Sequence, residues 1–166
     1  MGYRDARVDQ AVIEQITQRG TLTGFATELD TQVVQQIKAL CPQIDKMRFA
    51  NSGTEAVMQA VRLARYHTGR DKVVRFSGAY HGWWDDVQPG PGNPMPASSD
   101  TLTLREMHAM TLRVIEQRHD IACVLINPIQ AMHPNRAAPG DSTLMSNGRY
   151  CEFEPKAYGE WLQKLQ

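Results

Sequence analysis

The stretch Asn51-Ser52-Gly53-Thr54-Glu55-Ala56 decides the fold, because it joins a predicted strand at residues 47–50 to a predicted helix. Apolar residues then recur at the spacing of one helical face, at Val57, Ala60, Val61 and Ala64. The first amides of a helix have no intrahelical acceptors and lie at the positive end of its dipole. An anionic oxygen, such as that of a phosphate, would therefore bind beside Gly53 and Thr54. Ser52 and Thr54 would add hydroxyl donors.

The same stretch has an interpretation that needs no ligand. Ser52 and Glu55 have the spacing of a capping box, in which each side chain accepts a hydrogen bond from the other residue's backbone amide. Taken by itself, this motif favours the capping box over a phosphate site.

The sequence that follows changes this balance. Gly69-Arg70-Asp71 predicts a turn, and residues 72–76 predict a strand that runs into Ser77-Gly78-Ala79-Tyr80-His81-Gly82. An aromatic ring and an imidazole thus follow the carboxyl end of a strand. Ligands of open parallel α/β sheets bind outside these ends, so we expect the two loops to face one crevice.

Ser52-Gly53-Thr54-Glu55-Ala56, followed at this distance by Tyr80-His81-Gly82, resembles the class III aminotransferases, and most of all their glutamate-1-semialdehyde aminomutase branch. The resemblance covers most of the chain. It implies a three-layer α/β fold with a mostly parallel sheet, as in fold-type I transferases. It also implies a pyridoxal 5′-phosphate cofactor and transfer of an amino group between an amine and a carbonyl carbon.

The resemblance also implies roles for single residues. Ser52, Gly53 and Thr54 would hold the cofactor phosphate, and Tyr80 would stack on the pyridine ring. His81 is a weaker cofactor-binding candidate. The family works as a homodimer, and some members act on carrier-bound acyl substrates rather than free small molecules.

The family's two indispensable protein groups are not evident in this sequence. None of the five lysines follows the pattern that precedes the Schiff-base lysine, and the Asp that keeps the pyridine nitrogen protonated is also missing. We therefore expect residues 1–166 to be one partial domain from the large domain of a longer subunit, with no catalytic residue of its own. Whether the chain alone is an enzyme stays open.

Two residues are candidates for the substrate side of the site. Asn127 follows the apolar run Ile121–Ile126, which predicts a parallel strand buried on both faces. The family usually has Glu at this position, so Asn keeps the hydrogen bonding but loses the charge. Asn-Pro is also a common turn signal that needs no ligand. Trp83 could wall a substrate pocket, with Asp85 and Asp86 solvated beside it.

The remaining periodic segments predict helices. Early helices carry stripes at Val8, Ala11, Val12 and Ile16, and at Leu29, Val33, Ile37 and Leu40, the second of which we interpret as core. A later helix is expected to place Leu104, Met107, Thr111, Val114 and Ile115 on one face. The last helix opens at Glu154-Pro155, and we expect its apolar face to have nothing to pack on.

Composition excludes several classes of partner. Lys plus Arg equals Asp plus Glu at 18 each, which gives no basic surface for nucleic acid or an anionic membrane. No apolar run is long enough to span a bilayer. Three widely spaced cysteines argue for reduced thiols and a cytoplasmic protein. The five histidines show no zinc-binding spacing, so we expect no metal.

Other phosphate motifs do not fit. A triphosphate-binding loop needs Gly-Lys-Ser/Thr where this chain has Gly53-Thr54-Glu55, and no glycine-rich dinucleotide motif joins a strand to a helix. The alternative to an aminotransferase is a non-catalytic phosphate-binding or interaction domain derived from the same fold. Sequence beyond Gln166 would distinguish the two, because the enzyme needs its Asp and Lys there.

Overall fold

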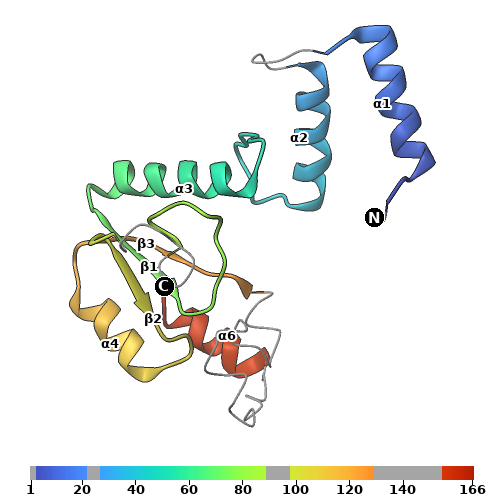
Figure 1. The fold of residues 1–166 in the computed structure, drawn as a ribbon. Helices are drawn as coiled ribbons and strands as arrows, with labels where there is room; N and C mark the ends of the chain where they lie inside the picture. Colours follow the sequence, from blue (N-terminus) through green and yellow to red (C-terminus); the bar gives the residue numbers. More distant parts are fainter. Residues whose placement is uncertain (1–2, 22–26, 89–97, 129–154) are drawn as a thin grey trace, which may run out of the picture. The chain divides into compact units, whose positions relative to one another are not determined.

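The computed structural model describes residues 3–21, 27–88, 98–128 and 155–166 of the chain (Figure 1). These residues belong to two compact units, 1–48 and 49–166, which are described separately. No helix in the described part is long and apolar enough to cross a membrane.

The first unit consists of helices α1 (Ala6–Arg19) and α2 (Glu28–Leu40), both predicted from their apolar stripes. Asp5 caps α1, and Thr27 and Asp30 form a full capping box at the start of α2. Neither helix has a buried residue. The prediction that the α2 stripe is core is therefore wrong for the unit by itself, because a lone helix pair cannot enclose its side chains.

The second unit is a parallel sheet between helices. Its elements are α3 (Gly53–Thr68), β1 (Lys72–Phe76), β2 (Thr101–Leu104), α4 (Ala109–Gln117), β3 (Ile121–Leu125) and α6 (Pro155–Gln163). The strand order is β2-β1-β3, and β1 is parallel to both of its neighbours. Helix α3 lies on one side of the sheet, and α4 and α6 lie on the other (Figure 1). The predicted three-layer α/β fold with a parallel sheet is confirmed.

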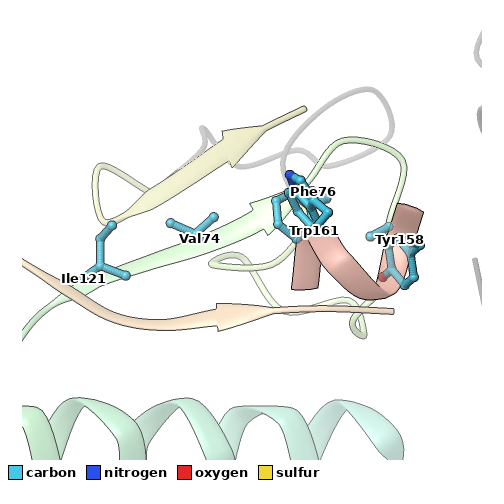
Figure 2. Packing of buried hydrophobic residues seen from close by; sticks show 6 residues of the cluster. Val74, Phe76, Ile121, Tyr158 and Trp161 are labelled. Carbon is cyan, nitrogen blue, oxygen red and sulfur yellow. The ribbon is translucent and has the colours of Figure 1, made fainter. Parts of the chain in front are cut away.

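The main core lies between the sheet and α6. Val74 and Phe76 of β1 pack with Ile121, and with Tyr158 and Trp161 of α6 (Figure 2). The Phe76 and Trp161 rings meet edge to face at 5.2 Å, and Trp161 stacks on Tyr158 at 6.2 Å. The prediction that the last helix has nothing to pack on is therefore wrong. Its apolar face covers the sheet. The sequence did not predict this contact, because α6 and β1 are far apart along the chain.

Two other local predictions are corrected. Residues 47–50 are not a strand, and Phe49 is exposed, because a strand needs a sheet neighbour and these residues have none in the described part. Residues Thr101–Leu104 form β2 beside β1, so Leu104 does not belong to a helix face. The Thr-Leu-Thr-Leu alternation has the period of a strand. Met107, at φ 54°, separates this strand from α4.

Strand β3 is parallel, as predicted, but it is buried less than expected. Ile121 is buried, whereas residues 122–125 are only half-buried. The reason is its position at the edge of the described sheet, since only β1 pairs with it.

Candidate cofactor site

Helix α3 begins at Gly53, with Ser52 as its N-cap. Ser52 Oγ accepts a hydrogen bond from the Glu55 amide at 3.2 Å, which confirms the first half of the predicted capping box. The second half is displaced by one residue, because the Glu55 carboxylate accepts from the amide of Asn51 at 2.8 Å rather than from Ser52. The cap therefore satisfies one helix amide and leaves others available.

The two amides that precede Glu55 in α3 are open to a ligand. The Glu55 amide donates to Ser52 Oγ, and the Ala56 amide donates to the Ser52 carbonyl. The amides of Gly53 and Thr54 have no acceptor within the described ranges. A Cβ placed on Gly53 would meet no atom within 4 Å, so there is room beside it. These features fit an anionic oxygen at the positive end of the helix.

The two motifs predicted to converge do meet. Helix α3 is followed by a short turn and β1, so its amino end lies at the carboxyl edge of the sheet. There the amide of Trp83 donates to Thr54 Oγ1 at 3.4 Å. Gly82, at φ 96°, lies so close to Thr54 that a Cβ on it would be 2.7 Å from Thr54 Oγ1. The loop after β1 is thus in contact with the first turn of α3.

Arg75 of β1 holds the start of this loop. The Arg75 side chain comes from β1, is 6% exposed, and donates through Nη2 to the carbonyl of Ala79, the residue before Tyr80. Burial lowers the pKa of this guanidinium. It forms no ion pair within the described residues, and its Nε has no hydrogen-bond partner there. Burying a cation costs free energy unless it is hydrogen-bonded, and the bond to the Ala79 carbonyl offsets part of this cost.

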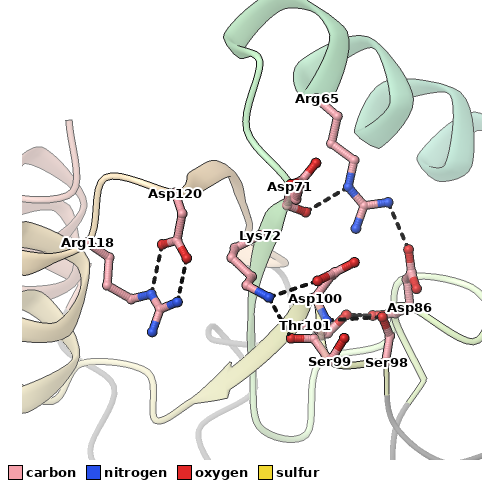
Figure 3. A network of polar contacts seen from close by, with 10 residues as sticks. All are labelled: Arg65, Asp71, Lys72, Asp86, Ser98, Ser99, Asp100, Thr101, Arg118 and Asp120. Carbon is pink, nitrogen blue, oxygen red and sulfur yellow. Dashed lines mark hydrogen bonds and ion pairs between the residues drawn. The ribbon is translucent and has the colours of Figure 1, made fainter.

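The other end of the loop is held by Asp86. Its carboxylate accepts from Arg65 Nη1 of α3 at 2.9 Å, and both side chains are mostly buried (Figure 3). Its carbonyl accepts from the Thr101 hydroxyl of β2 at 2.6 Å. The prediction that Asp86 is solvated is therefore wrong, whereas Asp85 is exposed as predicted. The difference arises because only one of two adjacent side chains can face the protein.

His81 lies inside this loop rather than on its surface. Its side chain is 8% exposed, and Nε2 has no hydrogen-bond partner in the described part of the chain. Burial lowers the pKa of the imidazole, and the positive charge of Arg75 lowers it further. His81 is therefore neutral at pH 7. Its predicted contact with a cofactor stays a prediction.

The remaining candidates lie at the same edge of the sheet. Tyr80 is 62% exposed and Trp83 is 76% exposed, so both rings present a face that a ligand could reach. Asn127 follows the end of β3, next to β1, and is half-buried. Stacking by Tyr80 and substrate contacts by Trp83 and Asn127 stay predictions.

Sequence reasoning missed Arg75 and the contact made by Gly82. A charged residue between the apolar Val74 and Phe76 was the available signal for Arg75, since a charged residue is rarely buried without a structural partner. Gly82 was part of the motif that carried the resemblance. Its close approach to Thr54 depends on how α3 packs on the sheet, where it contacts β3, and one sequence does not display this contact.

A parallel sheet between helix layers, with a helix amino end and an aromatic loop meeting at its carboxyl edge, places this chain among the three-layer α/β proteins. Comparisons with known proteins narrow the class. The family model for aminotransferase class-III matches residues 1–86. The glutamate-1-semialdehyde 2,1-aminomutase of Methanothermobacter thermautotrophicus is 42% identical over 142 residues, which cover 78% of this chain and 34% of that protein.

Solved structures agree with this match. An omega-transaminase from Sphaerobacter thermophilus is 30% identical with a TM-score of 0.72, over 99% of this chain and 38% of its own. A β-phenylalanine aminotransferase from Variovorax paradoxus is 37% identical with a TM-score of 0.66, over 76% of this chain and 30% of its own. The chain therefore belongs to the class III aminotransferases, which use pyridoxal 5′-phosphate. It spans about a third of the length of these relatives.

Proposed function

We propose that this chain forms the phosphate- and ring-binding part of a pyridoxal-phosphate-dependent aminotransferase or aminomutase. One observation carries the proposal. Thr54, in the first turn of α3, contacts Gly82 and Trp83, so the helix amides and the aromatic loop border one space. When bound, the cofactor supplies an aldehyde that bonds the substrate amine and a ring that withdraws electrons from it.

The phosphate would bind at the amino end of α3. The free amides of Gly53 and Thr54 and the Ser52 hydroxyl would donate to its oxygens, with the helix dipole adding to the attraction. Thr54 Oγ1 accepts from the Trp83 amide, which leaves its hydroxyl hydrogen for the phosphate. Each such hydrogen bond to a charged group contributes about 1.5–3 kcal/mol.

The loop after β1 would orient the ring. Tyr80 would cover one face of the pyridine ring, an arrangement that needs a flat aromatic side chain. His81, the next residue, is buried with its pKa lowered, so its imidazole would bring no additional positive charge to the site. Trp83 and Asn127 would border the substrate. Asn127 would donate and accept hydrogen bonds without the negative charge of the Glu usual in this family.

We also propose that the Schiff-base lysine and the Asp for the pyridine nitrogen come from outside residues 1–166, which would then be a partial large domain. Lys72, on β1, does not fill the first role. Its ammonium bonds the Ser99 carbonyl and the Asp100 carboxylate at the opposite, amino end of β1.

The same proposal covers the substrates, the oligomeric state and the cellular compartment of the parent protein. Its substrates would be a small amine and a carbonyl compound, or an acyl group held on a carrier, and the working unit would be a homodimer. The free thiols of Cys41 and Cys123 support a reducing compartment such as the cytoplasm. Cys151 lies outside the described residues.

Binding of pyridoxal 5′-phosphate to the chain tests this function. We expect saturable, non-covalent binding that is about tenfold or more tighter than that of pyridoxal, which lacks the phosphate. Inorganic phosphate should compete. Equal affinity for the two vitamers would contradict the phosphate site. Stoichiometric borohydride labelling of one lysine would contradict the claim that the Schiff-base residue lies elsewhere. Phosphate-selective binding by a full-length parent that transfers no amino group would favour the non-catalytic alternative.

A further inference from the structure

The contact between Gly82 and Thr54 is closer than a side chain would allow. A Cβ on Gly82 would lie 2.7 Å from Thr54 Oγ1 and 2.8 Å from Thr54 Cα. The second atom belongs to the backbone of α3, so a different Thr54 rotamer could not relieve the clash. Either the first turn of α3 or the loop would have to move.

The hydrogen bond beside this contact is too weak to define it. The Trp83 amide and Thr54 Oγ1 are 3.4 Å apart, beyond the usual range for such bonds. Close packing of Gly82 on the helix backbone is therefore what sets the spacing of the two segments. A positive φ of 96° adds a conformational reason for glycine.

The loop has little freedom to move away. Arg75 holds its first part through the Ala79 carbonyl, and Asp86 holds its last part through Arg65 and Thr101. With both ends held, a side chain at position 82 would displace Thr54 rather than the loop.

We propose that Gly82 is a positioning residue of the cofactor site, which sets Thr54 of the phosphate-binding turn at a fixed distance from Tyr80 of the ring-binding loop. This inference rests on the proposed function. Gly82 does not touch the ligand itself. Its missing side chain lets the helix amides and the aromatic ring approach closely enough to contact the phosphate and the ring of one molecule.

Gly82→Ala tests the proposal, with Gly69→Ala as its matched control. Gly69 caps α3 at φ 66°, so alanine there suffers similar backbone strain, but a Cβ would meet no atom within 4 Å. We expect Gly82→Ala to bind pyridoxal 5′-phosphate about tenfold or more weakly, as for a lost hydrogen bond to a charged group. Gly69→Ala should stay within about twofold. Backbone NMR should show the Thr54 and Trp83 amides shifted in the first variant alone.

A second measurement uses the unmodified chain, in case Gly82→Ala does not fold. Adding pyridoxal 5′-phosphate should shift the Gly82 and Thr54 amide signals together, because the two residues are in direct contact. Tight binding by Gly82→Ala, or a Thr54 shift without a Gly82 shift, would overturn the positioning role and leave the proposed function intact. A wild-type chain that binds no pyridoxal 5′-phosphate would overturn both.

Discussion

Ser52 has one role in the structure and a second in the proposed function. Its Oγ caps α3 by accepting from the Glu55 amide, while its hydroxyl hydrogen is available to a phosphate. We expect Ser52→Ala to lower the free energy of unfolding by about 1 kcal/mol through loss of the cap. It should also weaken binding of pyridoxal 5′-phosphate. Urea denaturation and ligand titration measure the two effects separately.

Ser77→Ala is the control for Ser52→Ala, because Ser77 is exposed and its hydroxyl makes no hydrogen bond within the described residues. It should change stability by less than about 0.5 kcal/mol. If Ser52→Ala lost stability but bound the cofactor normally, Ser52 would be a cap alone.

His81 should make stability depend on pH. Its folded-state pKa lies below its unfolded value of about 6.5, because of burial and the charge of Arg75. Between these two pKa values, His81 binds a proton in the unfolded chain but not in the folded chain. The free energy of unfolding should therefore fall as the pH drops below about 6.5, until the folded-state pKa is reached.

Urea midpoints measured between about pH 5 and 8 would show this dependence. His81→Gln should flatten the slope, whereas His67→Gln, at an exposed position on α3, should retain it. Burial also raises the pKa of Glu106, which makes stability fall with rising pH, but this contribution is common to all three proteins and cancels in the comparison. An unchanged slope in His81→Gln would contradict the assignment.

At the scale of elements, Asp86 joins the candidate loop to both α3 and β2. Asp86→Asn removes the charge opposite the mostly buried Arg65, whose Nη2 already has no partner in the described part. We expect a loss of about 1–3 kcal/mol, since a buried charged donor is left poorly satisfied. Asp85→Asn is the neighbouring exposed control and should be nearly neutral. Equal effects in chemical denaturation would show that the Arg65–Asp86 pair does not brace the loop.

Helix α6 depends on Trp161 for its attachment to the sheet. Trp161 is 6% exposed and contacts Phe76 and Tyr158, so Trp161→Ala should cost about 3–5 kcal/mol. Trp83→Ala, which removes an exposed ring, should cost less than about 0.5 kcal/mol. Thermal or urea denaturation would compare them. A loss in Trp161→Ala as small as the one expected for Trp83→Ala would mean that Trp161 contributes little to the attachment of α6.

The sequence predicted elements well where local signals agreed. Residues 72–76 combine β-branched side chains with a glycine turn before them, and they form β1 with the predicted bounds. Ser52 and Gly69 likewise marked both ends of α3. Strand β2 was missed because Leu104 also fitted the stripe of the following helix. The pairing of residues 101–104 with β1 shows that Leu104 follows the strand period and not the helix period.

The candidate site was predictable to the extent that parallel topology determines it. A helix that precedes a strand by a short turn has its amino end at that strand's carboxyl edge, so convergence of Thr54 with the loop after β1 followed from the order of elements. The buried state of His81 did not follow. It depends on Arg75 and on packing under the loop, which involve tertiary contacts rather than local sequence.

At the scale of the whole molecule, the two units differ in how much they bury. Val61, Val73, Val74 and Phe76 of the second unit are at most 1% exposed, whereas α1 and α2 contain no buried residue. Isolated helices of 14 and 13 residues are only marginally stable in water, and their stability in proteins comes mainly from packing. Packing therefore stabilises α1 and α2 much less than it stabilises β1.

We expect this difference to appear in amide hydrogen exchange, which reports local opening. Amides of α1 and α2 should exchange through local fraying, while those of β1, bonded on both sides, should exchange only with global unfolding of the second unit. Trp161→Ala should then speed exchange in β1 without affecting α1. Equal protection of α1 and β1 in the wild-type chain would contradict this division, because it would require packing of α1 that its exposed stripe of Val8, Val12 and Ile16 does not provide.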